Sequence, residues 1–303
     1  MSKAAKNLKQ QYTTKQTEDG YYIIDPMPSD AELHDYYANK YYTDDSSSQS
    51  YQAQYSDDEM QQKNLKADQY LYAIEKAIGS VKDKKLFEVG FGEGFLLNKA
   101  DQAGMEIDGV DFTSTGLRAM NPHLEEKLNF GDAYAYIDSL IEKGEAQFDV
   151  CVLQNVLEHI TDPAGLLANL KKLLKPGGVI VGNVPNDYSR LQLKAMETGL
   201  IDKEFWFAPI DHLYYFNTEN FKTIFEKSGL RVVDMFGDFP IDMFLFNENA
   251  NYVKDGSKGR GAHQARLTLD LLLSENGLPA YHQFCQALSG VGMGRNVCII
   301  AQK

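Results

Sequence analysis

Three glycines at alternate positions, followed by an acid further along the chain, form the part of this sequence best suited to chemistry. Gly90, Gly92 and Gly94 follow an apolar run, and Asp111 ends the next apolar run. Glycine adopts positive φ without a steric clash, so the triplet predicts a tight turn that presents free N–H groups at the start of a helix. An acid about twenty residues later can accept hydrogen bonds from both ribose hydroxyls. Together these residues predict a nucleoside-binding site.

The glycine spacing argues against a dinucleotide site. The dinucleotide fingerprint is G-x-G-x-x-G, and here the third glycine comes one residue early, with Phe95 in its place. An NAD-dependent oxidoreductase is therefore disfavoured. A lone glycine triplet is more often an ordinary turn, so the interpretation also depends on Asp111 and on the segments downstream. Glu88 lies inside the apolar run, where an acid must be paired or hydrogen-bonded.

These segments resemble those of a known family. The pattern Glu88-x-Gly90-x-Gly92-x-Gly94 resembles motif I of the class I S-adenosylmethionine-dependent methyltransferases, and Asp111 resembles their ribose-binding acid. Residues 148–160 resemble their fourth strand with the segment after it, and residues 174–181 resemble the turn into their fifth strand. The resemblance covers residues 84 to 236. It implies methyl transfer from S-adenosylmethionine, with S-adenosylhomocysteine as the product.

The resemblance also assigns cofactor-binding roles. Glu88 is expected to face the methionine ammonium group, the Asp132-Ala133 pair the adenine amino group, and His159 to shape the methyl-donor pocket. The alternative for Asp132 is an aspartate that caps the next turn. The full expected set is Glu88, Gly90, Gly92, Gly94, Asp111, Phe112, Asp132, Ala133, Gln154, Asn155 and His159.

A general base is needed only where the acceptor loses a proton, because alignment of donor and acceptor supplies much of the rate. His212 beside Asp211 is the predicted catalytic pair, since imidazole titrates near neutral pH and a carboxylate stabilises its charged form. The pair resembles the Glu-His pair of methyltransferases that act on nucleotide-linked sugars, with Asp in place of Glu. A histidine that only bridges backbone groups is the alternative.

The expected acceptor is a small polar metabolite, with a nucleotide-linked or phosphorylated sugar as the first choice. The sugar enzymes often carry a cysteine-rich, metal-binding N-terminal domain, which this sequence lacks. O- or N-methylation of another small acid is one alternative, and a protein that binds S-adenosylmethionine without turnover is another.

A run of cations is the candidate for binding the acceptor. Residues 254–266 concentrate Lys and Arg within an acidic protein and precede a helical pattern at 265–273. Arg260 and Arg266 are predicted to hold a phosphate or carboxylate, with a solvated loop as the alternative. The predicted acceptor contacts are Tyr42, Tyr215, Asn251, Arg260, His263 and Arg266.

Strands and helices alternate along the chain and predict an α/β fold. The expected strands are 85–90, 106–112, 128–130, 148–154, 179–184, 231–236 and 296–302, and the expected helices are 95–103, 113–120, 164–174 and 218–228. The predicted architecture is a Rossmann-like, doubly wound, mostly parallel seven-stranded sheet, in which the family places the last strand antiparallel. Residues 1–80 are expected to form an N-terminal helical lid, and residues 81–303 the cofactor-binding domain, with acceptor-covering insertions at 186–217 and 238–295. The tyrosine-rich residues 36–55 suit either a lid over the cofactor or simple packing.

Composition limits the partners and the compartment. The net charge of −13 and the pI of about 4.9 argue against a nucleic-acid substrate and favour small molecules, possibly anionic. The three cysteines have no metal-site or disulfide spacing, so no metal is expected. No signal peptide or membrane-spanning run is evident, which predicts a cytoplasmic monomer or homodimer without a membrane partner.

Overall fold

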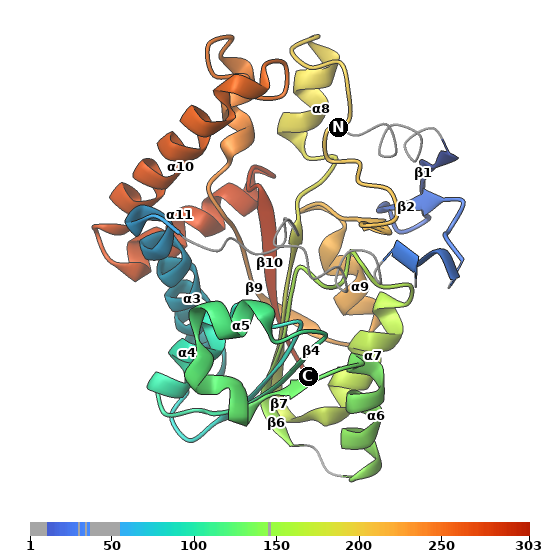
Figure 1. Cartoon of the computed structure of the whole chain (residues 1–303), viewed down its shortest axis with the longest axis vertical. Helices are drawn as coiled ribbons and strands as arrows, with labels where there is room; N and C mark the ends of the chain where they lie inside the picture. Colours follow the sequence, from blue (N-terminus) through green and yellow to red (C-terminus); the bar gives the residue numbers. More distant parts are fainter. Residues whose placement is uncertain (1–10, 30, 34, 37–54, 145–146) are drawn as a thin grey trace.

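The computed structural model describes residues 11–29, 31–33, 35–36, 55–144 and 147–303. Its main sheet has seven strands in the order β5-β4-β3-β6-β7-β10-β9 (Figure 1). The strands are β3 (Lys85–Val89), β4 (Glu106–Asp111), β5 (Asn129–Phe130), β6 (Phe148–Gln154), β7 (Leu174–Pro185), β9 (Arg231–Gly237) and β10 (Asn296–Gln302). Neighbours from β5 to β7 pair in parallel, whereas β10 is antiparallel to both β7 and β9. The predicted Rossmann-like sheet with an antiparallel last strand is confirmed.

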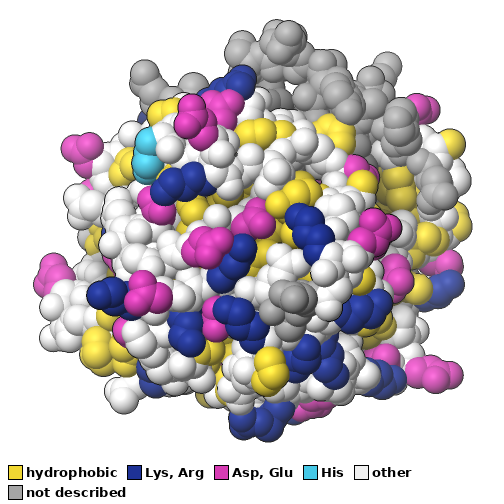
Figure 2. Space-filling model, turned by 90° about the horizontal axis from the view of Figure 1, so that it is seen from below, with side chains coloured by type: hydrophobic (Ala, Val, Ile, Leu, Met, Phe, Trp, Pro, Cys, Tyr) yellow, Lys and Arg dark blue, Asp and Glu magenta, His cyan; other side chains and the backbone are white. Residues whose placement is uncertain are grey.

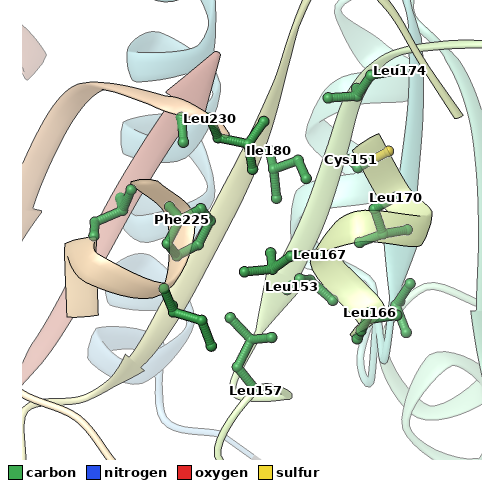
Figure 3. Close-up of a cluster of buried hydrophobic side chains, with 14 of the residues drawn as sticks. Cys151, Leu153, Leu157, Leu166, Leu167, Leu170, Leu174, Ile180, Phe225 and Leu230 are labelled. Carbon is green, nitrogen blue, oxygen red and sulfur yellow. The ribbon is translucent and has the colours of Figure 1, made fainter. Parts of the chain in front are cut away.

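Helices cover both faces of this sheet. One face carries α3 (Asp57–Ile78), α4 (Phe95–Gln102), α5 (Thr115–Met120) and α11 (Leu278–Gly290). The other face carries α6 (Ala133–Glu142), α7 (Pro163–Leu173) and α9 (Phe221–Lys227). Figure 3 shows the second face, where Leu167 of α7 lies nearer to Phe225 of α9 than Leu170 does. The inner strands are buried on both faces, which explains why their sequences read as almost continuous apolar runs.

Helix α3 belongs with the sheet, although the sequence predicted a domain boundary after residue 80. It begins at a capping box, in which Ser56 and Glu59 each bond the other's backbone N–H. Its Tyr70, Ala73 and Ile74 lie in the same hydrophobic cluster as strands β3, β6 and β7. Residues 57–78 are therefore part of the main core and not of a separate lid.

A small antiparallel sheet lies at the end of the main sheet where α8 (Arg190–Glu197) is also found (Figure 1). Its strands are β1 (Thr13–Gln16), β2 (Tyr22–Asp25) and β8 (Tyr214–Tyr215), in the order β1-β2-β8. Trp206 and Tyr215 from the insertion at 186–217 share a second core with Tyr12 and Ile24 of the N-terminal segment. The insertion starts after the carboxyl end of β7, so it is built at the predicted end of the sheet. The hairpin of β1 and β2 was not predicted.

The insertion at 238–295 only partly matches its predicted role. It contains η2 (Ile241–Phe246), η3 (Gly256–Lys258), α10 (Gly259–Ser274) and α11. Tyr281 and Cys285 of α11 are buried in the core of the α3 face, so α11 is part of the main fold. Asp270 of α10 accepts hydrogen bonds from Gln62 of α3 and from Tyr281, which joins three helices through one buried carboxylate.

The surface carries both signs of charge despite the acidic total. Figure 2 shows Lys and Arg side chains gathered on part of the face seen from below, with Asp and Glu side chains among them. Within the described part of the chain, none of the helices combines the length and the apolar character that crossing a membrane requires.

Candidate functional site

The glycine turn between β3 and α4 has the predicted conformation. Gly90, Gly92 and Gly94 have φ of 70°, 54° and 73°, in the left-handed region. A Cβ on Gly94 would lie 2.6 Å from Leu117 Cδ1, and one on Gly90 would lie 2.9 Å from Val156 Cγ2. Glycine is therefore required at both positions for packing as well as for backbone geometry. Gly94 is the N-cap residue of α4, and among the described residues no side chain caps the start of this helix.

Asp111 is part of this turn. Its Oδ2 accepts a hydrogen bond from Gly92 N at 2.8 Å, and its Oδ1 accepts one from Thr113 N at 3.1 Å. Burial raises the pKa of Asp111, while the backbone hydrogen bonds oppose that shift. A carboxylate offers about four acceptor positions, so two backbone bonds leave capacity for ligand hydroxyls. The neighbouring Phe112 is 45% exposed and supplies an aromatic surface beside the acid.

Glu88 is a buried acid with only one of its oxygens satisfied. Its side chain is 1% exposed, and Gln154 Nε2 donates a hydrogen bond to its Oε1. Oε2 has no hydrogen-bond partner among the described residues. Burial raises the pKa of Glu88 to about 8, with the Gln154 bond opposing and Asp111 adding to the shift. A buried polar atom without a partner is unfavourable unless a ligand completes it.

The end of β6 carries the next predicted residues. Asn155 adopts positive φ, at 52°, and donates its backbone N–H to Asn183 O at 2.8 Å. Asn183 Nδ2 in turn donates to Asn155 Oδ1 at 3.0 Å. Asn183, which is 4% exposed, was not predicted from sequence. It fixes the turn that follows Gln154.

Asp132 has the structural role that the sequence left as an alternative. It is the N-cap of α6, and its Oδ1 accepts a hydrogen bond from Ala135 N at 2.7 Å. Ala133 is the first residue of that helix. Their contact with adenine stays a prediction.

The tyrosine-rich stretch reaches the glycine turn at its last residue. The Tyr55 hydroxyl donates to Glu93 Oε1, and Lys63 Nζ lies 2.9 Å from Glu93 Oε2. Glu93 stands between Gly92 and Gly94, so this contact joins residue 55 to the predicted cofactor loop. Tyr42 and the other residues of 37–54 lie outside the described residues, and the lid stays a prediction.

A second group of acids and imidazoles lies just beyond β6. The ligand-type atoms of Glu158, His159 and His212 all lie within 4.8 Å of one another. The ring centroids of His159 and His212 are 4.9 Å apart, and the two rings are nearly perpendicular. Leu213 N and Tyr214 N both donate to Glu158 O, at 2.7 and 3.2 Å, which fixes the insertion against the segment after β6. Burial raises the pKa of Glu158 to about 8.

The predicted pairing of Asp211 with His212 needs correction. Asp211 lies beside His159 instead: its carbonyl is 2.5 Å from His159 Nδ1, and its Oδ1 is 3.6 Å from the same nitrogen. The carboxylate nearest His212 is Asp187, whose Oδ2 is 3.9 Å from His212 Nδ1. Burial lowers the pKa of His212, but Asp187 and Glu158 outweigh this effect and the net shift is upward. Asp187, which follows β7, was not predicted.

Two predicted acceptor contacts are structural residues. Tyr215 is 1% exposed and its hydroxyl donates to His212 O at 3.1 Å. Asn251 is 2% exposed, and its Nδ2 donates to the carbonyls of Leu200 and Leu245. Both side chains donate hydrogen bonds to backbone carbonyls. The neighbouring sequence did not indicate these contacts.

The cationic segment is divided between solvent and protein contacts. Arg260 is exposed at the start of α10. His263 Nε2 lies 3.1 Å from Glu59 Oε1 of α3, and Arg266 Nη2 lies 3.2 Å from His263 Nδ1. His263 thus contacts the acidic start of α3, Arg266 contacts His263, and their binding of an acceptor stays a prediction.

The site fits the cofactor that the motifs imply. The unpartnered Oε2 of Glu88 suits an ammonium donor, and Asp111 keeps acceptor capacity for ribose hydroxyls beside an exposed aromatic ring. These two acids stand on neighbouring strands, β3 and β4, on either side of the glycine turn.

Curated relatives match part of the chain. A ubiquinone biosynthesis O-methyltransferase of Psychrobacter cryohalolentis is 35% identical over 102 residues, 32% of this chain and 39% of the relative. One from Caulobacter sp. strain K31 is 28% identical over 167 residues, 52% of this chain and 62% of the relative. The chain thus spans less than two thirds of the length of each.

Solved structures of methyltransferases align with much of the chain at TM-scores below 0.5. An S-adenosylmethionine-dependent methyltransferase from Archaeoglobus fulgidus has a TM-score of 0.49 at 18% identity, covering 82% of this chain and all of that one. Phosphoethanolamine N-methyltransferase 2 of Haemonchus contortus, in complex with S-adenosyl-L-methionine, has a TM-score of 0.46 at 18% identity, covering 77% of this chain and 52% of that one.

A family model described as a methyltransferase domain matches residues 21–235, which is more than half of the chain and includes the glycine turn, Asp111 and the segment after β6. The chain belongs to this methyltransferase family, of the class I type that uses S-adenosylmethionine.

Proposed function

We propose that this protein transfers a methyl group from S-adenosylmethionine to a hydroxyl oxygen of a small polar acceptor. One observation carries the proposal: β6 and the segment after it link the two groups of functional residues. Gln154, the last residue of β6, donates a hydrogen bond to one carboxylate oxygen of Glu88. Glu158 and His159 follow Gln154 within a short segment of the chain. The predicted methyl-donor site and the cluster of Glu158, His159 and His212 thus both lie at the carboxyl end of β6. The relatives named as O-methyltransferases favour oxygen as the acceptor atom.

Each residue group has a distinct task in this proposal. S-adenosylmethionine, when bound, supplies an electrophilic methyl carbon. Glu88 accepts hydrogen bonds from the ammonium end of the cofactor, and Asp111 accepts them from the ribose. His212 lies at the acceptor side, where the acidic side chains of Glu158 and Asp187 stabilise a positive charge on it when the acceptor gives up its proton. Alignment of the acceptor oxygen with the methyl carbon supplies the remaining acceleration.

Fewer observations support the chemical class of the acceptor than support methyl transfer itself. A nucleotide-linked or phosphorylated sugar remains the first acceptor to test, and another small acidic metabolite with a hydroxyl group is the second. Arg260 supports an anionic acceptor, because it is exposed at the start of α10, where no side chain of the described residues caps the helix. The relatives' name points to a hydroxylated ring compound as a third class for the same assay.

The test begins with calorimetric titration of the protein with S-adenosylmethionine, S-adenosylhomocysteine and NAD. We expect the first two to bind and NAD not to bind. Formation of S-adenosylhomocysteine is then followed with nucleotide sugars, sugar phosphates and hydroxylated aromatic acids as acceptors. Binding of NAD alone would overturn the proposal. Cofactor binding without turnover on any hydroxyl acceptor would favour a binding protein.

The variant His212→Ala tests the acceptor side of the site. We expect it to lose most turnover and to keep its affinity for S-adenosylhomocysteine. The control is His123→Ala, which changes an exposed histidine whose partner is Asn98. Full activity of His212→Ala would make His212 a structural residue.

A further inference from the structure

We infer that Glu158, His159 and His212 form a binding site for one divalent transition-metal ion. Each side chain offers one ligand atom, and the three atoms lie within 4.8 Å of one another. Two of the residues follow β6 and the third comes from the insertion at 186–217, so the fold brings together groups that are distant in sequence. Two imidazoles and one carboxylate are a common ligand set for zinc, iron and manganese.

Glu158 is the strongest indication of a cation. Its side chain is 2% exposed, and neither carboxylate oxygen has a hydrogen-bond partner among the described residues. An acid in this position is unfavourable unless a positive charge compensates it. Its backbone carbonyl already fixes the insertion by accepting from Leu213 N and Tyr214 N, a role that any residue could fill. The carboxylate therefore needs a separate explanation, which a metal ion supplies.

One of the two imidazoles, His159, has the outer hydrogen bond expected of a metal ligand. His159 Nδ1 is 2.5 Å from the Asp211 carbonyl oxygen, so this nitrogen carries the proton and donates it. Nε2 of the same ring then carries the lone pair, and it lies 3.8 Å from Glu158 Oε1. On the other ring, His212 Nδ1 has no hydrogen-bond partner among the described residues, and the carboxylate oxygen nearest to it is Asp187 Oδ2 at 3.9 Å. Metal-bound histidines usually have a carbonyl or carboxylate at the outer nitrogen.

The local charge also favours a cation. Glu158 and Asp187 bring two carboxylates to the two imidazoles, and Arg295 Nη1, at 3.1 Å from Asp187 Oδ1, compensates one of them. A divalent ion would offset the remaining negative charge.

Three protein ligands leave open positions for an acceptor hydroxyl, and this role rests on the proposed function. The bound O–H would lose its proton to water, because the cation lowers the pKa of the hydroxyl. The oxygen lone pair then forms the bond to the methyl carbon, the carbon–sulfur bond breaks, and its electron pair stays on sulfur. With the ion bound, His212 would be a ligand; this replaces the base role that the proposed function gives it, while the methyl transfer to a hydroxyl oxygen stays the same.

The binding test uses protein freed of metal with a chelator and then titrated with Zn²⁺, Mn²⁺, Co²⁺ or Mg²⁺ alone. We expect one equivalent of a transition-metal ion to bind more tightly than Mg²⁺, and Co²⁺ to give a visible absorption band typical of nitrogen and oxygen ligands. Glu158→Gln and His159→Gln should each weaken binding at least about tenfold. His123→Ala, which alters an exposed histidine, should bind as the wild type does.

The variants must remain folded for this test to count. Glu158→Gln keeps the side-chain shape and removes a buried charge, so circular dichroism and affinity for S-adenosylhomocysteine should stay unchanged. The metal site would be overturned if the wild type did not bind one equivalent of metal. It would also be overturned if Glu158→Gln and His159→Gln both bound the metal as tightly as the wild type. Turnover that persists in chelator would refute the catalytic role of the metal while leaving the proposed function intact. Metal binding without methylation of any hydroxyl acceptor would instead refute the function alone.

Discussion

Replacing Glu88 with Gln should remove a large pH dependence from the stability of the protein without cofactor. The folded protein holds this carboxyl buried, with its pKa raised to about 8, whereas the unfolded chain ionises near the ordinary value of 4.5. Glutamine has the same shape, and its Oε1 can keep the hydrogen bond from Gln154 Nε2. The substitution therefore isolates the effect of ionisation.

The sign and size follow from linkage. Because the folded pKa is raised, the contribution of Glu88 to stability is complete below about pH 4.5 and is lost as the pH rises toward 8. Each pH unit in this window removes about 1.4 kcal/mol of unfolding free energy. From pH 5 to pH 8 the wild type should lose about 4 kcal/mol relative to Glu88→Gln. The variant should be the more stable protein at pH 8.

The assay is urea unfolding followed by circular dichroism and by the fluorescence of the single Trp206, at half-unit steps from pH 5 to pH 8. Asp138→Asn is the control, because it removes an exposed carboxylate from α6 and shows what a change in net charge alone does. The difference between wild type and Glu88→Gln should grow steadily with pH, while the control stays parallel to the wild type. Parallel curves for Glu88→Gln would refute the reasoning.

Three further results are expected. Asp111→Asn should weaken S-adenosylhomocysteine binding about tenfold or more by calorimetry, because charge-assisted bonds to the ribose are lost; unchanged affinity would reject the ribose role. Asp270→Ala should lower the unfolding free energy, measured by urea unfolding, by about 2 to 4 kcal/mol and leave cofactor affinity unchanged. The substitution leaves two buried donors, the Tyr281 hydroxyl and Gln62 Nε2, without their acceptor. Arg260→Ala should raise the KM of an anionic acceptor several-fold but not that of a neutral one, and equal KM values would restore the solvated-loop interpretation.

The sequence predicted those elements whose signal is local. The predicted bounds 148–154 and 296–302 agree with β6 and β10, because each is an apolar run bounded by polar or turn residues. β7 starts earlier than predicted, at Leu174, which pairs with Phe148 ahead of a register shift. The hairpin of β1 and β2 was missed because β1 is mostly exposed and has no apolar alternation. Strand β2 of this hairpin pairs with β8, which lies far along the chain, so the sequence around the hairpin does not indicate the pairing.

The site shows the same limit. The glycine turn and Asp111 were predictable because spacing along one βαβ unit fixes their geometry. The partner of His212 was not, because its neighbour Asp211 lies against His159 while Asp187 arrives from the end of β7. Glu158 was also missed as a functional side chain. Like Glu88, Glu158 is an acid in a largely apolar segment, where an unpaired carboxylate is unfavourable, and this signal was available in the sequence.

The position of β10 has a consequence for how the protein is made. β10 joins β7 to β9, yet residues 238–295 must be synthesised after β9 before it appears. At ribosomal rates this interval lasts roughly 3 to 12 s. During that time one edge of β7 stays unpaired, with Val179 and Val181 awaiting their partners. The half of the sheet that holds the glycine turn can form on the ribosome, but the nascent chain presents an adhesive strand edge until its final strand emerges.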